Sequence, residues 1–137
     1  MDYENIRLKY SYQISTYVSR IASSMKVSAS TYGGHMVTTS GYVTPGEDTE
    51  VIIENCLKNF YELLEKDYPN EYQENIGNMV KKVFDNDVMP RVKKANQSKM
   101  NSEMTKSYYG NALWDIVTMA IFFGIIIFVL WIFGVLK

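Results

Sequence analysis

Hydrophobic residues divide the chain into two parts. Residues 116–136 are 21 consecutive positions without a charged side chain, whereas the hydrophobic residues before them are spaced among polar ones. A helix of 21 residues would be about 31 Å long, close to the roughly 30 Å hydrocarbon core of a bilayer. The pattern predicts a C-terminal membrane anchor over residues 112–137, preceded by a domain over residues 1–111.

The residues within and beside the charge-free block are typical of a transmembrane helix. Trp114 and Trp131 stand near its two ends, where indole rings favour the membrane–water interface. The residues expected to contact lipid are Trp114, Ile116, Phe123, Phe128, Trp131 and Leu136. The alternative is that the block is a buried core helix of a domain without a membrane.

Shorter hydrophobic stripes predict helices in residues 1–111. Apolar residues recur three and four positions apart, which places them on one face of a helix. The stripes lie within residues 3–27, 53–64 and 76–84, and a weaker one within 88–106. No segment predicts a strand convincingly, so the expected fold is all-α: a small helical bundle with a C-terminal transmembrane helix.

Turn-forming residues separate these helices. Residues 28–46 are rich in Ser, Thr and Gly and predict a long mobile loop. Residues 44–47 (TPGE) have the form of a helix start, and Pro69 is expected to end the same helix. Residues 85–87 (DND) are expected to break the helical pattern that precedes them.

Charge indicates the orientation of the anchor. The formal net charge of −1 argues against a nucleic-acid partner. Four lysines precede the charge-free block, and such an excess marks the cytosolic side of a membrane span; they are Lys93, Lys94, Lys99 and Lys106. The domain is therefore expected to face the cytosol. Asn96 begins an N-glycosylation sequon, and we expect it to stay unmodified.

Residue types used in catalysis are scarce. The one histidine, His35, lies in the predicted loop, and the one cysteine, Cys56, lies on an apolar stripe. No metal-ligand spacing, phosphate-binding loop or dinucleotide motif is present in the sequence. We expect no enzymatic activity, no cofactor and no metal. A domain of about 110 residues is small, so a homodimer is one way to complete its core.

Four short motifs resemble the homology regions of the B-cell lymphoma 2 family of apoptosis regulators. In chain order they resemble the fourth, third, first and second regions: residues 3–15 (YENIRLKYSYQIS), 51–61 (VIIENCLKNFY), 83–92 (VFDNDVMPRV) and 110–117 (GNALWDIV). Glu54-Asn55 stands where the family has Gly-Asp, and Met89-Pro90 stands where it has Trp-Gly. The divergence and small size are most like a viral member.

The resemblance implies an anti-apoptotic protein that holds a pro-death amphipathic helix in an apolar groove, at the mitochondrial outer membrane or endoplasmic reticulum. The implied lining is Leu57, Tyr61, Leu64, Val80 and Phe84, with Arg91 pairing with an aspartate of the bound helix. Without such a role, the apolar residues would be core and Arg91 a surface residue. The family's central helix is apolar, whereas residues 93–106 are polar. Either the domain is a reduced version, or the block after Trp114 takes the central position.

A second function is compatible with the same pattern. A single-pass structural membrane protein, such as a viral envelope or inner-membrane component, needs only an anchor and a small helical head. It would have lipid as its main partner and no affinity for pro-death helices.

Overall fold

The computed structural model describes residues 1–32 and 38–132. The chain divides into two compact units. We call the first, Met1–Ser28 with Tyr42–Met100, the head unit, and the second, Ala29–Gly41 with Asn101–Lys137, the tail unit. His35 and Leu136 lie outside the described residues.

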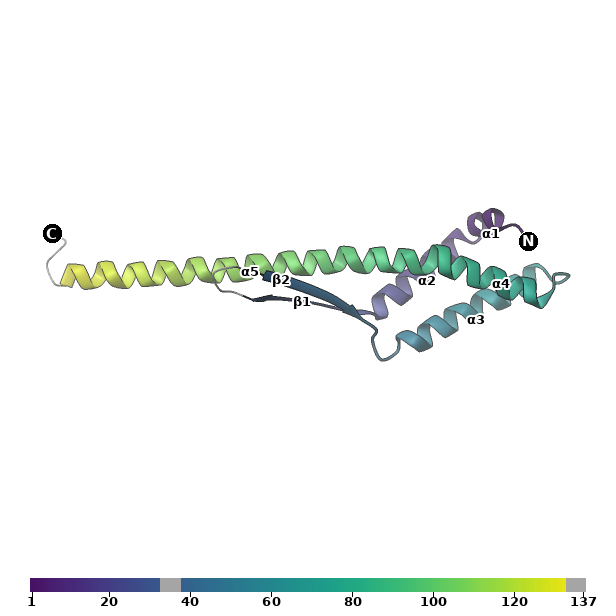
Figure 1. Ribbon diagram of the computed structural model, residues 1–137, viewed down its shortest axis with the longest axis horizontal. Helices are drawn as coiled ribbons and strands as arrows, with labels where there is room; N and C mark the ends of the chain where they lie inside the picture. The colour runs from purple at the N-terminus through teal and green to yellow at the C-terminus, as the bar shows by residue number, and fades with distance from the viewer. Residues whose placement is uncertain (33–37, 133–137) are drawn as a thin grey trace. The chain divides into compact units, whose positions relative to one another are not determined.

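The chain is mostly helical, as the hydrophobic stripes predict (Figure 1). In order, the elements are α1 (Tyr3–Lys9), α2 (Ser11–Ser24), β1 (Lys26–Tyr32), β2 (Thr38–Thr44), α3 (Thr49–Asp67), α4 (Gln73–Val83), the π-helical turn η1 (Phe84–Val88) and α5 (Met89–Ile132). The two strands make the all-α expectation approximate.

Residues 28–46, expected to be a loop, contain most of a two-stranded sheet. The hydroxyls of Thr31 and Thr39 are 3.1 Å apart, and those of Ser30 and Ser40 are 3.5 Å apart, which places these residues opposite each other. Hydroxyl-rich strands pair through their backbones and lack the apolar alternation by which strands are recognised. In the tail unit, Thr31 also forms a 2.7 Å hydrogen bond with Ser107 of α5.

The helix expected over residues 3–27 is two helices, with a break at Tyr10. The Tyr10 ring is buried, and its hydroxyl donates a 2.6 Å hydrogen bond to the carboxylate of Asp67 at the end of α3. This bond ties the break to α3. At the other end, β1 begins at Lys26, so α2 ends at Ser24.

The helix expected to start within 44–47 begins at Thr49. The Thr49 hydroxyl is buried, accepts a 2.8 Å bond from the Gly46 amide and donates a 3.2 Å bond to the Ser24 carbonyl. A Cβ at Gly46 would lie 2.3 Å from that carbonyl oxygen. Glycine at position 46 therefore allows the chain to pass α2 closely before α3 begins.

Residues 85–87 do not interrupt the helix. They lie in η1, where the Met89 amide bonds to the Phe84 carbonyl, five residues back. Pro90 follows, and a proline lacks the amide that would bond to the carbonyl four residues earlier, while its ring crowds that carbonyl. A wider π turn at this point removes the conflict. Helical structure thus continues from Gln73 to Ile132.

The core of the head unit is built from the stripes that predict its helices. The Phe60 ring is fully buried and lies within 5.7–6.3 Å of the rings of Tyr10, Tyr17 and Phe84. Around these lie the other buried apolar residues: Ile6, Ile14, Ile21, Cys56, Leu64, Ile76, Met79, Val80, Val83, Val88 and Val92. The core therefore joins α1, α2, α3, α4 and η1 with the first turn of α5.

The apolar part of α5 is exposed. Its side chains include Trp114, Ile116, Phe123, Phe128 and Trp131, and none of the most apolar 18-residue window is buried. By length and composition this helix could cross a membrane. Within the described residues, these side chains contribute nothing to the core of the head unit.

Candidate functional site: an apolar groove in the head unit

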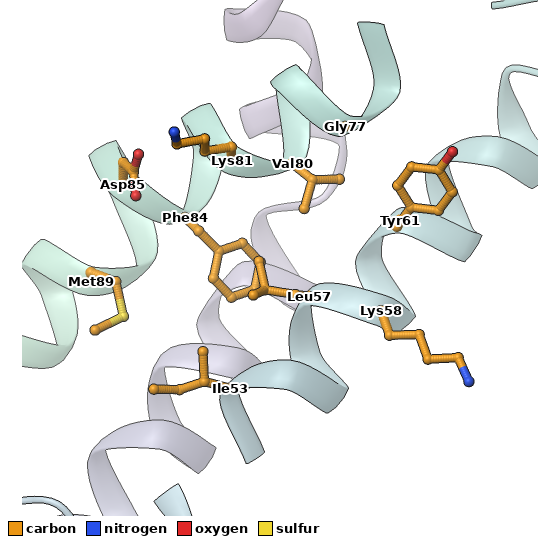
Figure 2. A pocket seen from close by; sticks show the side chains of 10 residues that line it. All are labelled: Ile53, Leu57, Lys58, Tyr61, Gly77, Val80, Lys81, Phe84, Asp85 and Met89. Atoms are coloured by element: carbon orange, nitrogen blue, oxygen red, sulfur yellow. The ribbon is translucent and has the colours of Figure 1, made fainter. Parts of the chain in front are cut away.

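An open apolar pocket of about 590 Å³ lies between α3 and the continuous helix formed by α4, η1 and the start of α5 (Figure 2). From α3 it is lined by Ile53, Leu57, Lys58 and Tyr61, and from the other wall by Gly77, Val80, Lys81, Phe84, Asp85 and Met89. Every lining residue belongs to the head unit.

The lining residues are spread along both walls of the pocket. One wall runs from Ile53 to Tyr61 and the other from Gly77 to Met89. At a rise of 1.5 Å per residue these walls are about 12 Å and about 18 Å long. The longer wall equals about three turns of helix, so we call the pocket the α3–α4 groove.

Core residues form the floor of the groove. Val80 and Phe84 are buried, yet both contribute to the lining. Leu57 projects toward Phe84 from α3, and Figure 2 shows Ile53 and Tyr61 along the same wall. Leu57 and Tyr61 are half-buried and pack against the core. The base of the open pocket is therefore apolar.

Charged side chains lie at both rims of the groove (Figure 2). Lys58 extends from α3, with its ammonium 3.9 Å from the Glu62 carboxylate, and both groups are exposed. Lys81 and Asp85 lie on the opposite wall. Among the described residues, Lys81 has no carboxylate within ion-pair distance. The lining thus carries two cations and one anion.

Gly77 leaves a gap in the longer wall. It lies inside α4, and a Cβ built on it would meet no atom within 4 Å. A glycine inside a helix costs about 1 kcal/mol relative to alanine. Among the described residues, no close contact requires glycine at this position. The space beside Gly77 opens into the groove.

Four of the residues predicted to line a groove meet in this one: Leu57, Tyr61, Val80 and Phe84. Leu64, also predicted, is fully buried in the core and is not among the lining residues. The prediction did not include the other six lining residues, which are Ile53, Lys58, Gly77, Lys81, Asp85 and Met89. Of these, Ile53 continues the stripe of Leu57 at a spacing of four. Occupation of the groove by a ligand stays a prediction.

Arg91 lines a different cavity, of about 340 Å³, between α1, α2 and η1. Its guanidinium donates a 3.0 Å hydrogen bond to the Ser15 hydroxyl. In the same cavity the Arg7 guanidinium lies 3.5 Å from the Asp87 carboxylate, to which the Tyr3 hydroxyl also donates. This hydrogen bond raises the pKa of Tyr3 to about 12. Asp87 thus helps to hold α1 against η1, and Arg91 helps to hold α2 against the first turn of α5.

Metal-ligating side chains do not cluster in the part of the chain that the structure describes. Within 1–32 and 38–132, no group of three or more His, Cys, Asp or Glu side chains could hold a metal ion. The Cys56 thiol is buried, and this burial raises its pKa. A buried, protonated thiol is a poor nucleophile. The α3–α4 groove offers a ligand an apolar surface with charged side chains at its rims.

No protein-family model, no curated protein and no solved structure matches this chain. The resemblance to the B-cell lymphoma 2 family therefore rests on the short sequence motifs alone. The function has to be inferred from the groove and from the exposed apolar helix.

Proposed function

We propose that the protein is a membrane-anchored docking protein whose head unit binds an amphipathic helix of a partner in the α3–α4 groove. The observation that supports this proposal is the apolar floor formed by Leu57, Val80 and Phe84. A groove about 18 Å long accommodates about 12 helical residues. Helices bind such grooves through apolar side chains at positions i, i+3 or i+4, and i+7.

The partners that we propose are pro-death proteins that carry such a helix. Sequestering them at an intracellular membrane would inhibit apoptosis. The sequence motifs support this partner class, and four implied groove residues line one pocket. Arg91 is excluded from the proposed contact because it lines the other cavity. Any carboxylate of the bound helix would instead meet Lys58 or Lys81.

Peptide titration of the full chain tests this function. The chain would be reconstituted in nanodiscs and titrated with labelled pro-death helix peptides. Leu57→Glu places a charge on the apolar floor and should weaken binding about tenfold or more. Val51→Glu is the matched control, because Val51 lies on α3, is 56% exposed and does not line the groove. No binding by the unmodified chain up to about 100 μM peptide would reject the function.

Membrane anchoring by the apolar part of α5, with the head unit in the cytosol, is the second part of the proposal. The lysines that precede the apolar residues support this orientation. Asn96 is a poor reporter of it, because its side chain is buried and bonds to the Met25 sulfur at 2.8 Å.

An engineered sequon tests the orientation more directly. Asn70 and Tyr72 are both exposed, so Tyr72→Thr creates an Asn-Glu-Thr acceptor on the surface. With the head unit in the cytosol, Asn70 should carry no glycan in eukaryotic cells. The same variant behind a secretory leader should be glycosylated, which shows that the site is usable. A glycan without the leader would contradict the proposed orientation.

A structural membrane protein is the second candidate. The observation that favours it is the exposed apolar part of α5, which accounts for membrane attachment without any use of the groove. Such a protein would copurify with a viral particle or a membrane assembly. It would bind no amphipathic peptide, and Leu57→Glu would leave its incorporation unchanged.

A further inference from the structure

The α3–α4 groove combines two features that restrict what can occupy it. Gly77 leaves space at the longer wall, and no described residue of the chain fills that space. Lys58 and Lys81 extend from opposite walls on either side of the apolar floor (Figure 2). Neither feature contributes a contact to the core of the head unit.

The glycine bears on how closely a partner can approach. Two helices pack at interaxial distances of about 8–10 Å, and the side chains at the crossing point set the value. Small residues at the crossing allow the backbones to come closest. A partner helix that crosses α4 at Gly77 would fill the open space with its own side chain or backbone.

The lysines bear on the charge of the partner. Lys81 has no ion pair among the described residues, and Lys58 has only the exposed contact with Glu62. With one carboxylate, Asp85, against two ammonium groups, the lining is net positive. Charge complementarity across an interface mainly selects partners and speeds association.

We infer that the occupant of the α3–α4 groove is an acidic amphipathic helix of a partner protein, which crosses α4 at Gly77 and carries carboxylates on both flanks of its apolar stripe, facing Lys58 and Lys81. This inference rests on the proposed helix-docking function and specifies the partner's chemistry. It assigns the specificity to these two lysines and the crossing point to the glycine.

The crossing point is tested by filling the space at Gly77 in the full chain in nanodiscs. Gly77→Leu adds a side chain where a Cβ meets no atom, so the fold should be retained and peptide binding should fall about tenfold or more. Gly77→Ala should reduce binding by a smaller factor. Gly110→Leu is the matched control, since a Cβ there also meets nothing within 4 Å and Gly110 does not line the groove. Thermal unfolding checks that all variants are folded.

The charge preference is tested with two synthetic amphipathic peptides of about 16 residues that share one leucine stripe. One carries glutamates on both flanks and the other carries lysines. The unmodified chain should bind the glutamate peptide about fivefold or more tightly, and the difference should shrink between about 50 mM and about 500 mM salt. Lys58→Glu with Lys81→Glu should reverse the preference. Lys66→Glu, an exposed change elsewhere on α3, should leave it unchanged.

The outcomes of these experiments distinguish helix docking in general from docking of an acidic helix that crosses α4 at Gly77. If pro-death peptides bind but neither Gly77→Leu nor the charge reversal changes their affinity, the inference is overturned and helix docking stands. A preference for the lysine peptide also overturns the inference. If no peptide binds the unmodified chain, helix docking itself fails. Binding of a fluorescent fatty acid in place of any peptide would assign the groove to lipid and overturn both.

Discussion

The hydrophobic residues of helices α3 and α4 and those of the apolar part of α5 have different surroundings. In α3, Cys56, Phe60 and Leu64 lie on one face and are buried within the head unit. In α5, residues 116–132 are apolar except for Thr118, and all but Leu130 are exposed. A single apolar stripe can be covered by neighbouring helices of the same chain, whereas an apolar cylinder needs a surrounding apolar medium.

The part of α5 that precedes the apolar residues has a third kind of surface. Residues 97–111 of α5 are polar on most sides and largely exposed. Lys106 forms a 2.9 Å ion pair with Glu103, and Ser107 bonds to Thr31 within the tail unit. A helix with few apolar residues suits solvent. Along its length α5 is therefore packed against the head unit at its first turn, polar and largely exposed in its middle, and apolar and exposed toward its end.

The largest expected effect is on the exposed apolar helix. Phe123→Arg with Ile126→Arg places two charges in its middle, where each costs about 2.5–3.5 kcal/mol of insertion. We expect loss of membrane association in alkaline carbonate extraction. Ser102→Arg with Thr105→Arg has the same spacing in the polar part of α5 and should leave the chain in the membrane pellet. Retention of the Phe123/Ile126 variant in the pellet would contradict lipid contact.

The next effect is on the packed core of the head unit. Phe60→Ala removes a fully buried ring that contacts three other aromatic rings, and should reduce the free energy of unfolding by about 3–5 kcal/mol. Urea denaturation followed by near-ultraviolet circular dichroism measures the change. Tyr72→Ala, at a position 78% exposed, should stay within about 0.5 kcal/mol of the unmodified chain. Equal effects of the two variants would contradict the described core.

A smaller effect compares two glycines of the head unit. Gly46→Ala forces a Cβ to 2.3 Å from the Ser24 carbonyl oxygen, and should destabilise the head by about 1–3 kcal/mol. Gly77→Ala meets no atom, and should stabilise it by up to about 1 kcal/mol through helix propensity. Thermal unfolding of both variants gives the comparison. If Gly46→Ala were the more stable of the two variants, the close approach of Gly46 to the Ser24 carbonyl would be contradicted.

The smallest effect concerns the pH dependence of the head unit. Burial and the hydrogen bond to Asp67 raise the pKa of Tyr10 to about 12, and the bond to Asp87 raises that of Tyr3 to about 12. A raised pKa in the folded state contributes stability that is present below about pH 10 and is lost as the pH rises toward 12. We therefore expect alkaline destabilisation over this range, measured by circular dichroism beside tyrosinate absorbance.

The Tyr10–Asp67 hydrogen bond also makes the stability of the head unit depend on pH at the acidic end. Hydrogen bonds from Tyr10 and Lys9 lower the pKa of Asp67, so its contribution is present above about pH 4 and is lost as the pH falls. Tyr10→Phe should weaken the pH dependence at both ends. Tyr12→Phe, at a position 79% exposed, is the control and should weaken neither. Identical pH profiles for Tyr10→Phe and the unmodified chain would contradict the Tyr10–Asp67 bond.

The helices and the exposed apolar segment could be predicted from the sequence because their signals are local. The spacing of Cys56, Phe60 and Leu64 indicates a buried helix face before any tertiary contact is known. The hairpin could not be predicted in this way, because Thr31 and Thr39 become neighbours only when β1 and β2 pair. Its residues resemble a loop in composition.

The lining of the groove could be predicted only in part, because it too depends on tertiary packing. Leu57 and Leu64 occupy one stripe of α3, yet Leu64 is fully buried while Leu57 lines the groove. Which apolar positions become core and which become groove wall depends on how far the neighbouring helices cover α3. Sequence periodicity identifies the apolar face of a helix but not how much of that face the neighbouring helices bury.

By itself, the sequence determined that the chain would pair a helical head with an apolar helix long enough to span a bilayer, because both follow from the order of apolar and polar residues. Only the tertiary structure decided which residues share a site. Asp85 and Met89 line the α3–α4 groove, while Asp87 and Arg91, two residues further on, line the other cavity. Two positions along a helix turn a side chain by about 200°, so these two pairs face opposite sides. The packing of α3 on one side and of α1 and α2 on the other decides which cavity each pair lines.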